Sequence, residues 1–268
     1  SGLVGSEMCI RDRNKDLGKA FGFHRAGDNF GAVIGPFTAL ILLYTMNNDV
    51  KAVAKWALIP AAISALFTLF VKDVKTHESK TTFHKVPLSP ALKRTITMLV
   101  IIQVTNIPDA LLLLRLHDIG FSTPGVVIGY IVYMFVAMLF AYPAGRVSDH
   151  LHPKYVYLIG LTFFAIGYMT LGLTNNHSLA LLALAFYGLF PALTDGVGKT
   201  WIGRMSDKDS RGYAQGLFQS SMNFAVLAAG IWGGLIWSSA DKEIALIIAG
   251  AGALVGALFI SQYRTDAA

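Results

Sequence analysis

Charged residues are scarce in this sequence of 268 residues. Asp, Glu, Lys and Arg make up 14% of it, whereas hydrophobic residues make up 54%. A typical soluble domain carries about 25% charged residues, so the composition excludes an ordinary soluble protein. The net charge of +6 is spread over short loops and is not gathered on one soluble face, as a nucleic-acid-binding surface requires. We therefore expect no nucleic-acid partner.

Cysteine and the common enzyme motifs are also nearly absent. Cys9 is the single cysteine, which excludes a disulfide framework and a cysteine-based metal site. The sequence contains no Gly-x-Ser-x-Gly turn and no phosphate-binding loop that follows a strand. His150 and His152 share a short loop without further ligands, so we expect no metal. No enzyme activity and no cofactor are predicted.

Long apolar stretches are abundant instead. Each is about 20 residues long, which is enough for a helix to cross the ~30 Å hydrocarbon core of a bilayer. The prediction is an all-α membrane protein with about eight transmembrane helices. The expected spans are 29–46, 52–71, 95–116, 125–144, 155–173, 179–202, 214–237 and 244–260.

The connections alternate between basic and nearly neutral. One set holds most of the Lys and Arg residues, including those of the loop 72–94, whereas the other holds only Lys51, Lys55 and Lys242. Lys and Arg concentrate in cytoplasmic loops. We therefore expect a multi-pass protein of the plasma (inner) membrane with both termini in the cytoplasm.

The first residues differ in character from the rest. Ser1–Arg13 lacks the apolar core and the cleavage site of a signal peptide, and it resembles translated adapter sequence. We expect residues 1–16 to be a non-native or disordered leader. A short native cytoplasmic segment is the alternative.

An internal repeat relates Leu17–Phe30 to Arg211–Phe224. The two stretches share, in register, Gly18/Gly212, Ala20/Ala214, Gly22/Gly216, Asn29/Asn223 and Phe30/Phe224. A repeat of this kind predicts two halves related by an axis along the membrane normal. Residues 17–71 would be the last two helices of an N-terminal bundle, 72–94 a cytoplasmic connector and 95–268 a C-terminal six-helix bundle. The remaining N-terminal helices would then be partners from the same protein. Chance placement of small residues is the alternative.

Two short motifs accompany the repeat. In Gly31-Ala32-Val33-Ile34-Gly35-Pro36, Gly31 and Gly35 share one helix face and would allow close helix contact, while Pro36 would bend the helix. Ala39 and Leu40 follow where a Gly pair ends the related motif. Simple helix packing is the alternative to a gating role.

The second motif is the loop from Gly145 to Lys154. It matches Gly-x-x-x-Asp-Arg-x-Gly-Arg-Lys at Gly145, Asp149 and Lys154. Asp149 would meet Arg211 or a nearby helix N-terminus, whose partial positive charge favours an anion. Arg146 and Arg211 would belong to the same charged group. A solvated turn is the alternative.

With these motifs the chain resembles the major facilitator superfamily from Leu17 onward. The resemblance implies helices five to twelve of a twelve-helix transporter. The first motif resembles the family's antiporter motif and implies export. The second resembles the loop whose charge contacts hold the outward-facing state, which assigns Gly145, Arg146, Asp149, Lys154 and Arg211 to conformational change.

Inserting an ionisable residue at the centre of a membrane span costs roughly 2.5–3.5 kcal/mol. Such residues are therefore candidates for a functional or structural role. Asp109 lies deep in its span, three residues after Asn106, and Pro108 frees the carbonyl of Val104 from its helical partner. Together they would form a bent polar patch that binds a proton or a substrate cation. A structural carboxylate is the alternative.

Other polar residues point to the same cavity. Asp195 and Lys199 are four residues apart and would pair on one helix face, either in a substrate or ion site or as a structural pair. Arg115 is interpreted as a residue that extends to the membrane surface. Cavity lining is expected from Gln215, Gln219 and Asn223, with helix-packing hydrogen bonds as the alternative. Tyr130, Tyr133 and Trp232 would offer aromatic surfaces to a solute or serve as interfacial or packing residues.

These features predict a secondary active transporter of a small solute that works by alternating access. Proton-coupled export is the first interpretation, and the chain alone is expected to be inactive. Uptake by proton symport is the alternative. A membrane-embedded enzyme and a non-transporting sensor are less favoured.

Overall fold

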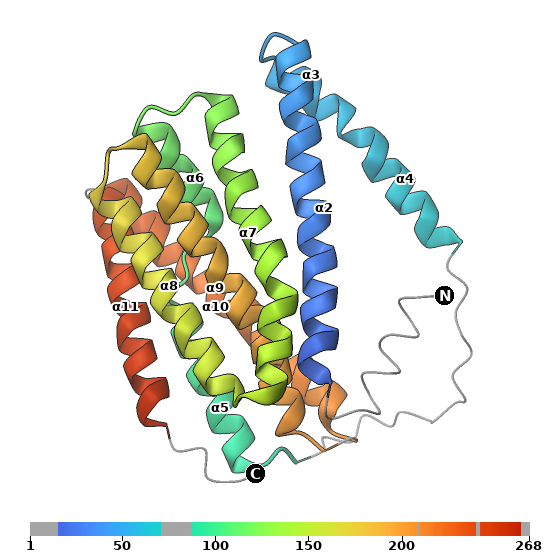
Figure 1. Cartoon of the computed structure of the whole chain (residues 1–268), viewed down its shortest axis with the longest axis vertical. Coiled ribbons are helices and arrows are strands. Elements are labelled where there is room, and N and C mark those ends of the chain that lie inside the picture. Colours follow the sequence, from blue (N-terminus) through green and yellow to red (C-terminus); the bar gives the residue numbers. More distant parts are fainter. Residues whose placement is uncertain (1–15, 71–86, 208, 240–241, 264–268) are drawn as a thin grey trace.

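A computed structural model describes residues 16–70, 87–207, 209–239 and 242–263. Within these ranges every regular element is an α-helix (Figure 1). The leader, apart from Asp16, and most of the connector lie outside the described residues. The helices are α2 (Leu17–Thr45), α3 (Val50–Trp56), α4 (Leu58–Leu69), α5 (Pro90–Gln103), α6 (Asp109–Asp118), α7 (Thr123–His150), α8 (Pro153–Leu173), α9 (His177–Arg204), α10 (Arg211–Ser239) and α11 (Lys242–Gln262).

Seven stretches of the described chain are long and apolar enough to cross a membrane. They are α2, the run Val50–Phe67 across α3 and α4, and each helix from α7 to α11. This confirms the prediction of an all-α membrane protein. The expected span 95–116 is different, because it is divided into α5 and α6.

Pro108 explains the division of that span. It has no N–H group, so the carbonyl of Val104 lacks its usual helical partner. The indole Nε1 of Trp232 in α10 donates to that carbonyl at 2.8 Å. The Tyr168 hydroxyl in α8 donates to the carbonyl of Ile107 at 2.9 Å. Side chains therefore satisfy the freed backbone groups, as an interruption within a membrane protein requires. Where a bend was predicted, the helix is interrupted between α5 and α6. The Trp232 indole stabilises this interruption by donating to the Val104 carbonyl.

The first long helix begins earlier than expected. α2 starts at Leu17 and not at residue 29, so Lys19 and Arg25 belong to a helix and not to a cytoplasmic loop. The small residues Gly18 and Gly22 are buried in it. The helix extends because these glycines pack closely against α7: a Cβ on Gly22 would lie 2.7 Å from the Ala141 carbonyl oxygen.

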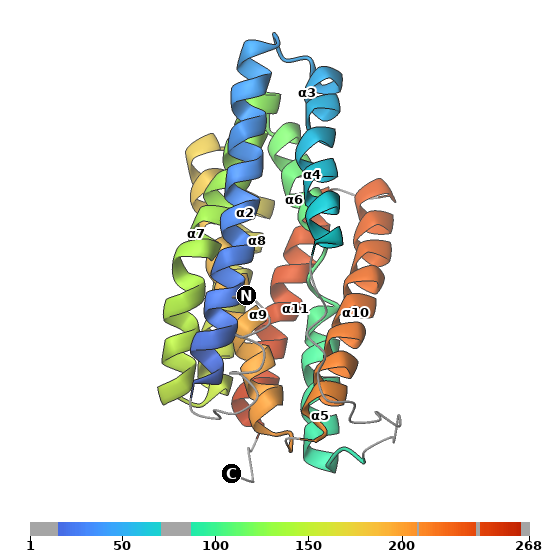
Figure 2. The same ribbon diagram turned by 90° about the vertical axis from the view of Figure 1, so that its right-hand side faces the viewer.

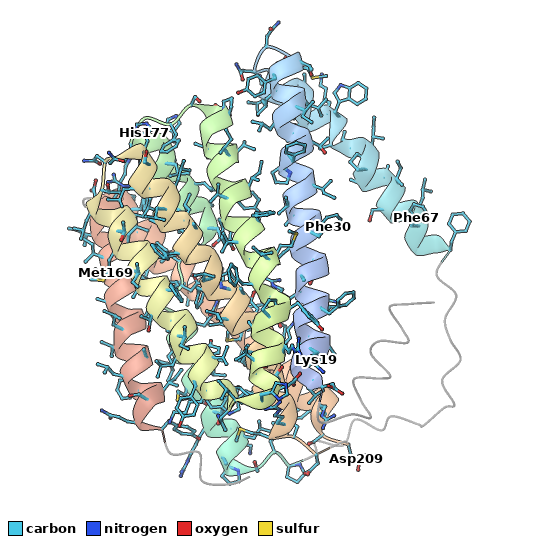
Figure 3. The ribbon with its side chains drawn as sticks, in the orientation of Figure 1. Lys19, Phe30, Phe67, Met169, His177 and Asp209 are labelled. Carbon is cyan, nitrogen blue, oxygen red and sulfur yellow. The ribbon has the colours of Figure 1, made fainter. Side chains whose placement is uncertain are left out.

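The helices fall into a packed group and a peripheral group. α8 packs between α9 and α11, and its Tyr157, Phe164 and Tyr168 side chains are fully buried. α7 lies between α9 and α2, and the α3–α4 segment leans away from the bundle (Figures 1 and 2). Phe30 of α2 and Phe67 of α4 are 57% and 68% exposed, and both project outward (Figure 3).

The repeat is visible in the helix boundaries. α2 and α10 both contain 29 residues. Both begin at the first residue of the repeated stretch, Leu17 in one copy and Arg211 in the other. The two helices therefore agree in length and in their first residue relative to the repeated stretch.

Candidate functional site: a central cavity and two charged helix ends

A polar cavity of about 430 Å³ lies among α2, α7, α9, α10 and the segment between α5 and α6. It falls within the range of about 300–1,000 Å³ that is usual for small-molecule sites. Most of the predicted cavity residues line it. These are Asn106, Asp109, Tyr133, Asp195, Lys199, Gln219 and Asn223.

Asp109 is held by hydroxyl groups. Tyr187 of α9 donates to one carboxylate oxygen at 2.6 Å, and Tyr133 of α7 donates to the other at 2.9 Å. Among the described residues, no Lys, Arg or His nitrogen lies within 4.0 Å of this carboxylate. Asp109 is also the first residue of α6, where the helix dipole favours an anion. Asn106 lies beside it, 3.4 Å from the Tyr187 hydroxyl. The predicted polar patch therefore exists.

Asp195 forms an ion pair with Arg25 of α2. The expected pair with Lys199 is not formed, because the Arg25 guanidinium reaches Asp195 from the neighbouring helix. In the described part of the chain, Lys199 has no carboxylate within 4.0 Å of its ammonium group. The cavity thus contains one paired cation and one that is unpaired.

Two predicted cavity residues do not line it. Tyr130 packs edge-on against Tyr133, with ring centroids 5.9 Å apart. Gln215 uses its amide to donate to the backbone carbonyl of Lys199 at 2.6 Å. Both residues contact lining residues of the cavity, Tyr133 and Lys199, without lining it themselves.

Sequence reasoning missed Arg25 and Tyr187. Arg25 was assigned to a loop, although the repeat pairs it with Gln219, and both line the cavity. The pairing of Arg25 with Gln219 in the repeat could therefore have identified Arg25 as a cavity residue. Tyr187 lies in an apolar helix where a tyrosine is ordinary, so no sequence signal identified it.

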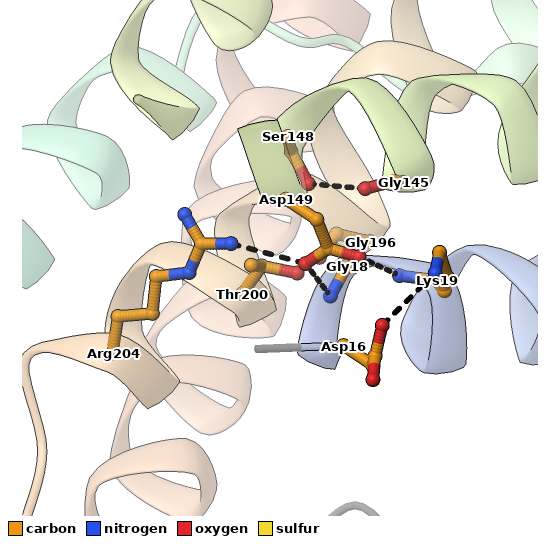
Figure 4. Close-up of polar contacts among 9 residues, drawn as sticks. All are labelled: Asp16, Gly18, Lys19, Gly145, Ser148, Asp149, Gly196, Thr200 and Arg204. Carbon is orange, nitrogen blue, oxygen red and sulfur yellow. Dashed lines mark hydrogen bonds and ion pairs between the residues drawn. The ribbon is translucent and has the colours of Figure 1, made fainter. Parts of the chain in front are cut away.

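At one end of the bundle, Asp149 binds the start of α2 (Figure 4). Its carboxylate accepts from the backbone N–H groups of Gly18 and Lys19, both at 2.8 Å. Arg204 at the end of α9 donates to it at 3.0 Å. The Asp149 side chain is 2% exposed. The expected helix N-terminus is thus its partner, and the cation is Arg204 where Arg211 had been suggested.

The other residues of this loop have separate contacts. Gly145 lies directly against the backbone of Gly18, and neither position has room for a Cβ atom. Lys154 donates to the carbonyls of Ser261 and Tyr263 at the end of α11. Arg211 donates to the carbonyl of Gly203. Arg146 is exposed.

The Gly31–Pro36 motif shows no such packing. A Cβ atom on Gly31 or Gly35 would meet nothing within 4 Å in the described chain. The prediction of close helix contact at these glycines is therefore not met by the described helices. Pro36 lies inside α2 as expected.

At the opposite end, Arg115 is buried and 4% exposed. It donates to the carbonyl of Thr174 at 3.2 Å and to Glu243 of α11 at 2.7 Å. A further bond reaches the carbonyl of Leu171. The interpretation of Arg115 as a surface-seeking residue was wrong, because the carbonyls at the end of α8 and the Glu243 carboxylate compensate its charge inside the protein.

No group of three or more His, Cys, Asp or Glu side chains in the described ranges is placed to hold a metal ion. The arrangement is instead that of a polytopic helical membrane protein, with a polar cavity enclosed by its helices and charged contacts at both ends.

The chain belongs to the major facilitator superfamily, whose model matches residues 95–267. It is 26% identical over 232 residues to an uncharacterized MFS-type transporter of Methanocaldococcus jannaschii. The match covers 83% of this chain and 58% of that relative's length. The chain is therefore a multi-pass integral membrane protein of a transporter family, and it spans less than two thirds of that relative's length.

Proposed function

We propose that the protein is a proton-coupled secondary transporter that moves a small solute through the central cavity by alternating access. The observation that carries this proposal is Asp109, a carboxylate in the cavity that two hydroxyl groups hold and that has no Lys, Arg or His nitrogen within 4.0 Å among the described residues. A carboxylate in such a place gains or loses a proton without breaking an ion pair. The proton gradient is then the energy source, and no cofactor is required.

The Asp149 contacts support a conformational role for the end of α7. They join α2, which belongs to the proposed N-terminal bundle, to α7 and α9 of the C-terminal bundle. Rocking of the two bundles must break these bonds. We assign Gly145, Asp149 and Arg204 to this contact, and we place this end and both termini in the cytoplasm of a plasma-membrane protein.

The repeat supports a twelve-helix whole. Gly18 and Gly22 of α2 pack against α7, but at their counterparts Gly212 and Gly216 of α10 a Cβ atom would meet nothing within 4 Å in the described chain. We propose that further N-terminal helices of the same protein cover this face of α10. This chain without them is expected to be inactive.

Two directions of transport are proposed. The Gly31–Pro36 motif supports export by antiport, in which solute and proton compete for the cavity. Lys199, which has no carboxylate within 4.0 Å of its ammonium group in the described chain, supports uptake by symport as the second candidate, in which solute and proton bind together.

The test is flux through the full-length gene product in proteoliposomes that contain a pH-sensitive dye. Ethidium serves as an amphipathic cation, and radiolabelled benzoate serves as an amphipathic anion. We expect proton movement coupled to the flux of one probe, opposite in direction for antiport and parallel for symport. Asp109→Asn should abolish the proton movement, whereas Asp118→Asn, outside the cavity, should not. Unaltered coupling in Asp109→Asn would refute the assignment of the proton site.

A further inference from the structure

One of the charged side chains that line the cavity has no compensating group among the described residues. Two basic and two acidic side chains line it, namely Arg25, Lys199, Asp109 and Asp195. Arg25 and Asp195 neutralise each other in an ion pair. Asp109 is compensated by two hydroxyl donors and the start of α6. Lys199 alone has no compensating group among the described residues.

The position of Lys199 is fixed by its surroundings. It lies one turn from Asp195 on α9, close enough for a pair, but that carboxylate is already held by Arg25. Gln215 holds the backbone carbonyl of Lys199 at 2.6 Å. Among the described residues, the ammonium group at the cavity wall has no carboxylate within 4.0 Å.

A cationic solute is disfavoured in this cavity. It would meet two cations, Arg25 and Lys199, while both carboxylates are already engaged. A monovalent anion instead finds one free ammonium group, which forms a charge-assisted hydrogen bond roughly twice as strong as a neutral one. Tyr157, Phe190 and Phe218 also line the cavity and offer surfaces for an apolar or aromatic body.

We propose that the transported solute is a small aromatic or apolar monocarboxylate whose carboxylate pairs with Lys199. This inference rests on the proposed function, since it assigns the substrate class of the same cavity. It also favours symport, because a proton on Asp109 removes a negative charge from the cavity that the solute anion enters.

The test compares probes that differ in charge and hardly in shape. Binding of benzoate, benzamide and benzylamine to the purified full-length protein is measured by thermal stabilisation and by competition against radiolabelled benzoate. We expect benzoate to bind at least about tenfold more tightly than benzamide, with benzylamine weakest. Equal binding of benzoate and benzamide, preference for benzylamine, or no binding of benzoate would overturn the proposal.

Variants locate the effect at Lys199. Lys199→Gln should remove the preference for benzoate over benzamide, whereas Lys199→Arg should retain it. Lys93→Gln, at an exposed position at the start of α5, serves as the matched control and should bind as the wild type does. A preference that persists in Lys199→Gln would refute the role of this residue.

The outcome is separable from that of the proposed function. Ethidium flux coupled to protons, without selective benzoate binding, would retain proton-coupled transport and reject the carboxylate. Selective benzoate binding without proton movement in the flux assay would retain the carboxylate site and reject the coupling.

Discussion

The two ends of the bundle use buried charge in opposite ways. At one end the anion Asp149 binds the N-terminus of α2 and the cation Arg204. At the other end the cation Arg115 binds the C-terminus of α8 and the anion Glu243. Both arrangements match the sign of the helix dipole.

The difference lies in which helices each contact joins. Asp149 joins α2, in the proposed N-terminal bundle, to α7 and α9. Arg115 joins α6, α8 and α11, which all lie in the proposed C-terminal bundle. A contact between halves controls their relative position, whereas a contact within one half stabilises the fold. The comparison therefore predicts different consequences for two equally buried charges.

The largest effect is expected from Arg115→Met. It leaves the carbonyls of Leu171 and Thr174 without their donor and removes the partner of Glu243. Breaking a buried charged contact costs about 3 kcal/mol, and we expect a corresponding loss in the free energy of unfolding, measured by thermal unfolding in detergent. Lys242→Gln, which removes the partly exposed pair with Asp118 at the same end, should cost less than about 1 kcal/mol. Equal losses would contradict the role of Arg115.

Asp149→Asn should change conformation more than stability. It weakens the charge interaction with the start of α2 and with Arg204 by roughly 1–2 kcal/mol, which shifts an equilibrium between two conformations about tenfold. Spin labels at Phe23 and Val147, which are 71% and 44% exposed, report the separation of α2 and α7. The native cysteines of the full-length protein, Cys9 among them, are replaced by Ser in this background so that only the introduced cysteines are labelled.

The expected result is a second, longer distance population in Asp149→Asn that is small in the wild type. Arg115→Met should leave the distance distribution unchanged. An unchanged distribution in Asp149→Asn, or a new population in Arg115→Met, would remove the distinction between the two ends.

The smallest effect is expected at His152. Burial, and then the charges of Lys154 and Arg204, lower the pKa of His152. Its Nδ1 accepts from the backbone N–H of Lys154 at the start of α8, and this bond requires a neutral ring. Because the folded state favours the neutral form, its stabilisation is complete above the ordinary pKa of about 6.5 and is lost as the pH falls.

His152→Asn keeps an acceptor at this position and removes the titration. From about pH 7.5 to about pH 5.5, on either side of the ordinary histidine pKa, the variant should lose less stability than the wild type. The difference should be well under about 1 kcal/mol, measured by thermal unfolding at each pH. A larger loss in the variant would show that protonation of His152 does not weaken the start of α8.

The sequence predicted much of the cavity because membrane burial makes polar residues informative. Asp109, Asn106 and Asp195 were identified from the cost of placing them in a span, and all three line the cavity. The partners could not be identified in this way. Arg25 reaches Asp195 from a helix distant in sequence, and an i to i+4 spacing such as that of Asp195 and Lys199 shows only which pairs are possible.

The start of the first long helix also depends on contacts with residues that are distant in sequence. Hydropathy placed the start of the first span at residue 29, because Lys19 and Arg25 resemble loop residues. The helix begins at Leu17, since Asp149 binds its first N–H groups and Gly18 and Gly22 pack on α7. The effect of Pro108 was predicted at the Val104 carbonyl, but the indole that satisfies this carbonyl comes from α10.

The interrupted α5–α6 segment has a consequence for biosynthesis. Neither helix qualifies alone as a candidate span, and the segment carries Asp109 and Arg115 toward the bilayer. The groups that satisfy its backbone and charges, including Tyr168, Trp232 and Glu243, all follow it in the chain. During synthesis the ribosome must therefore reach Glu243 before all of these contacts of the segment can form.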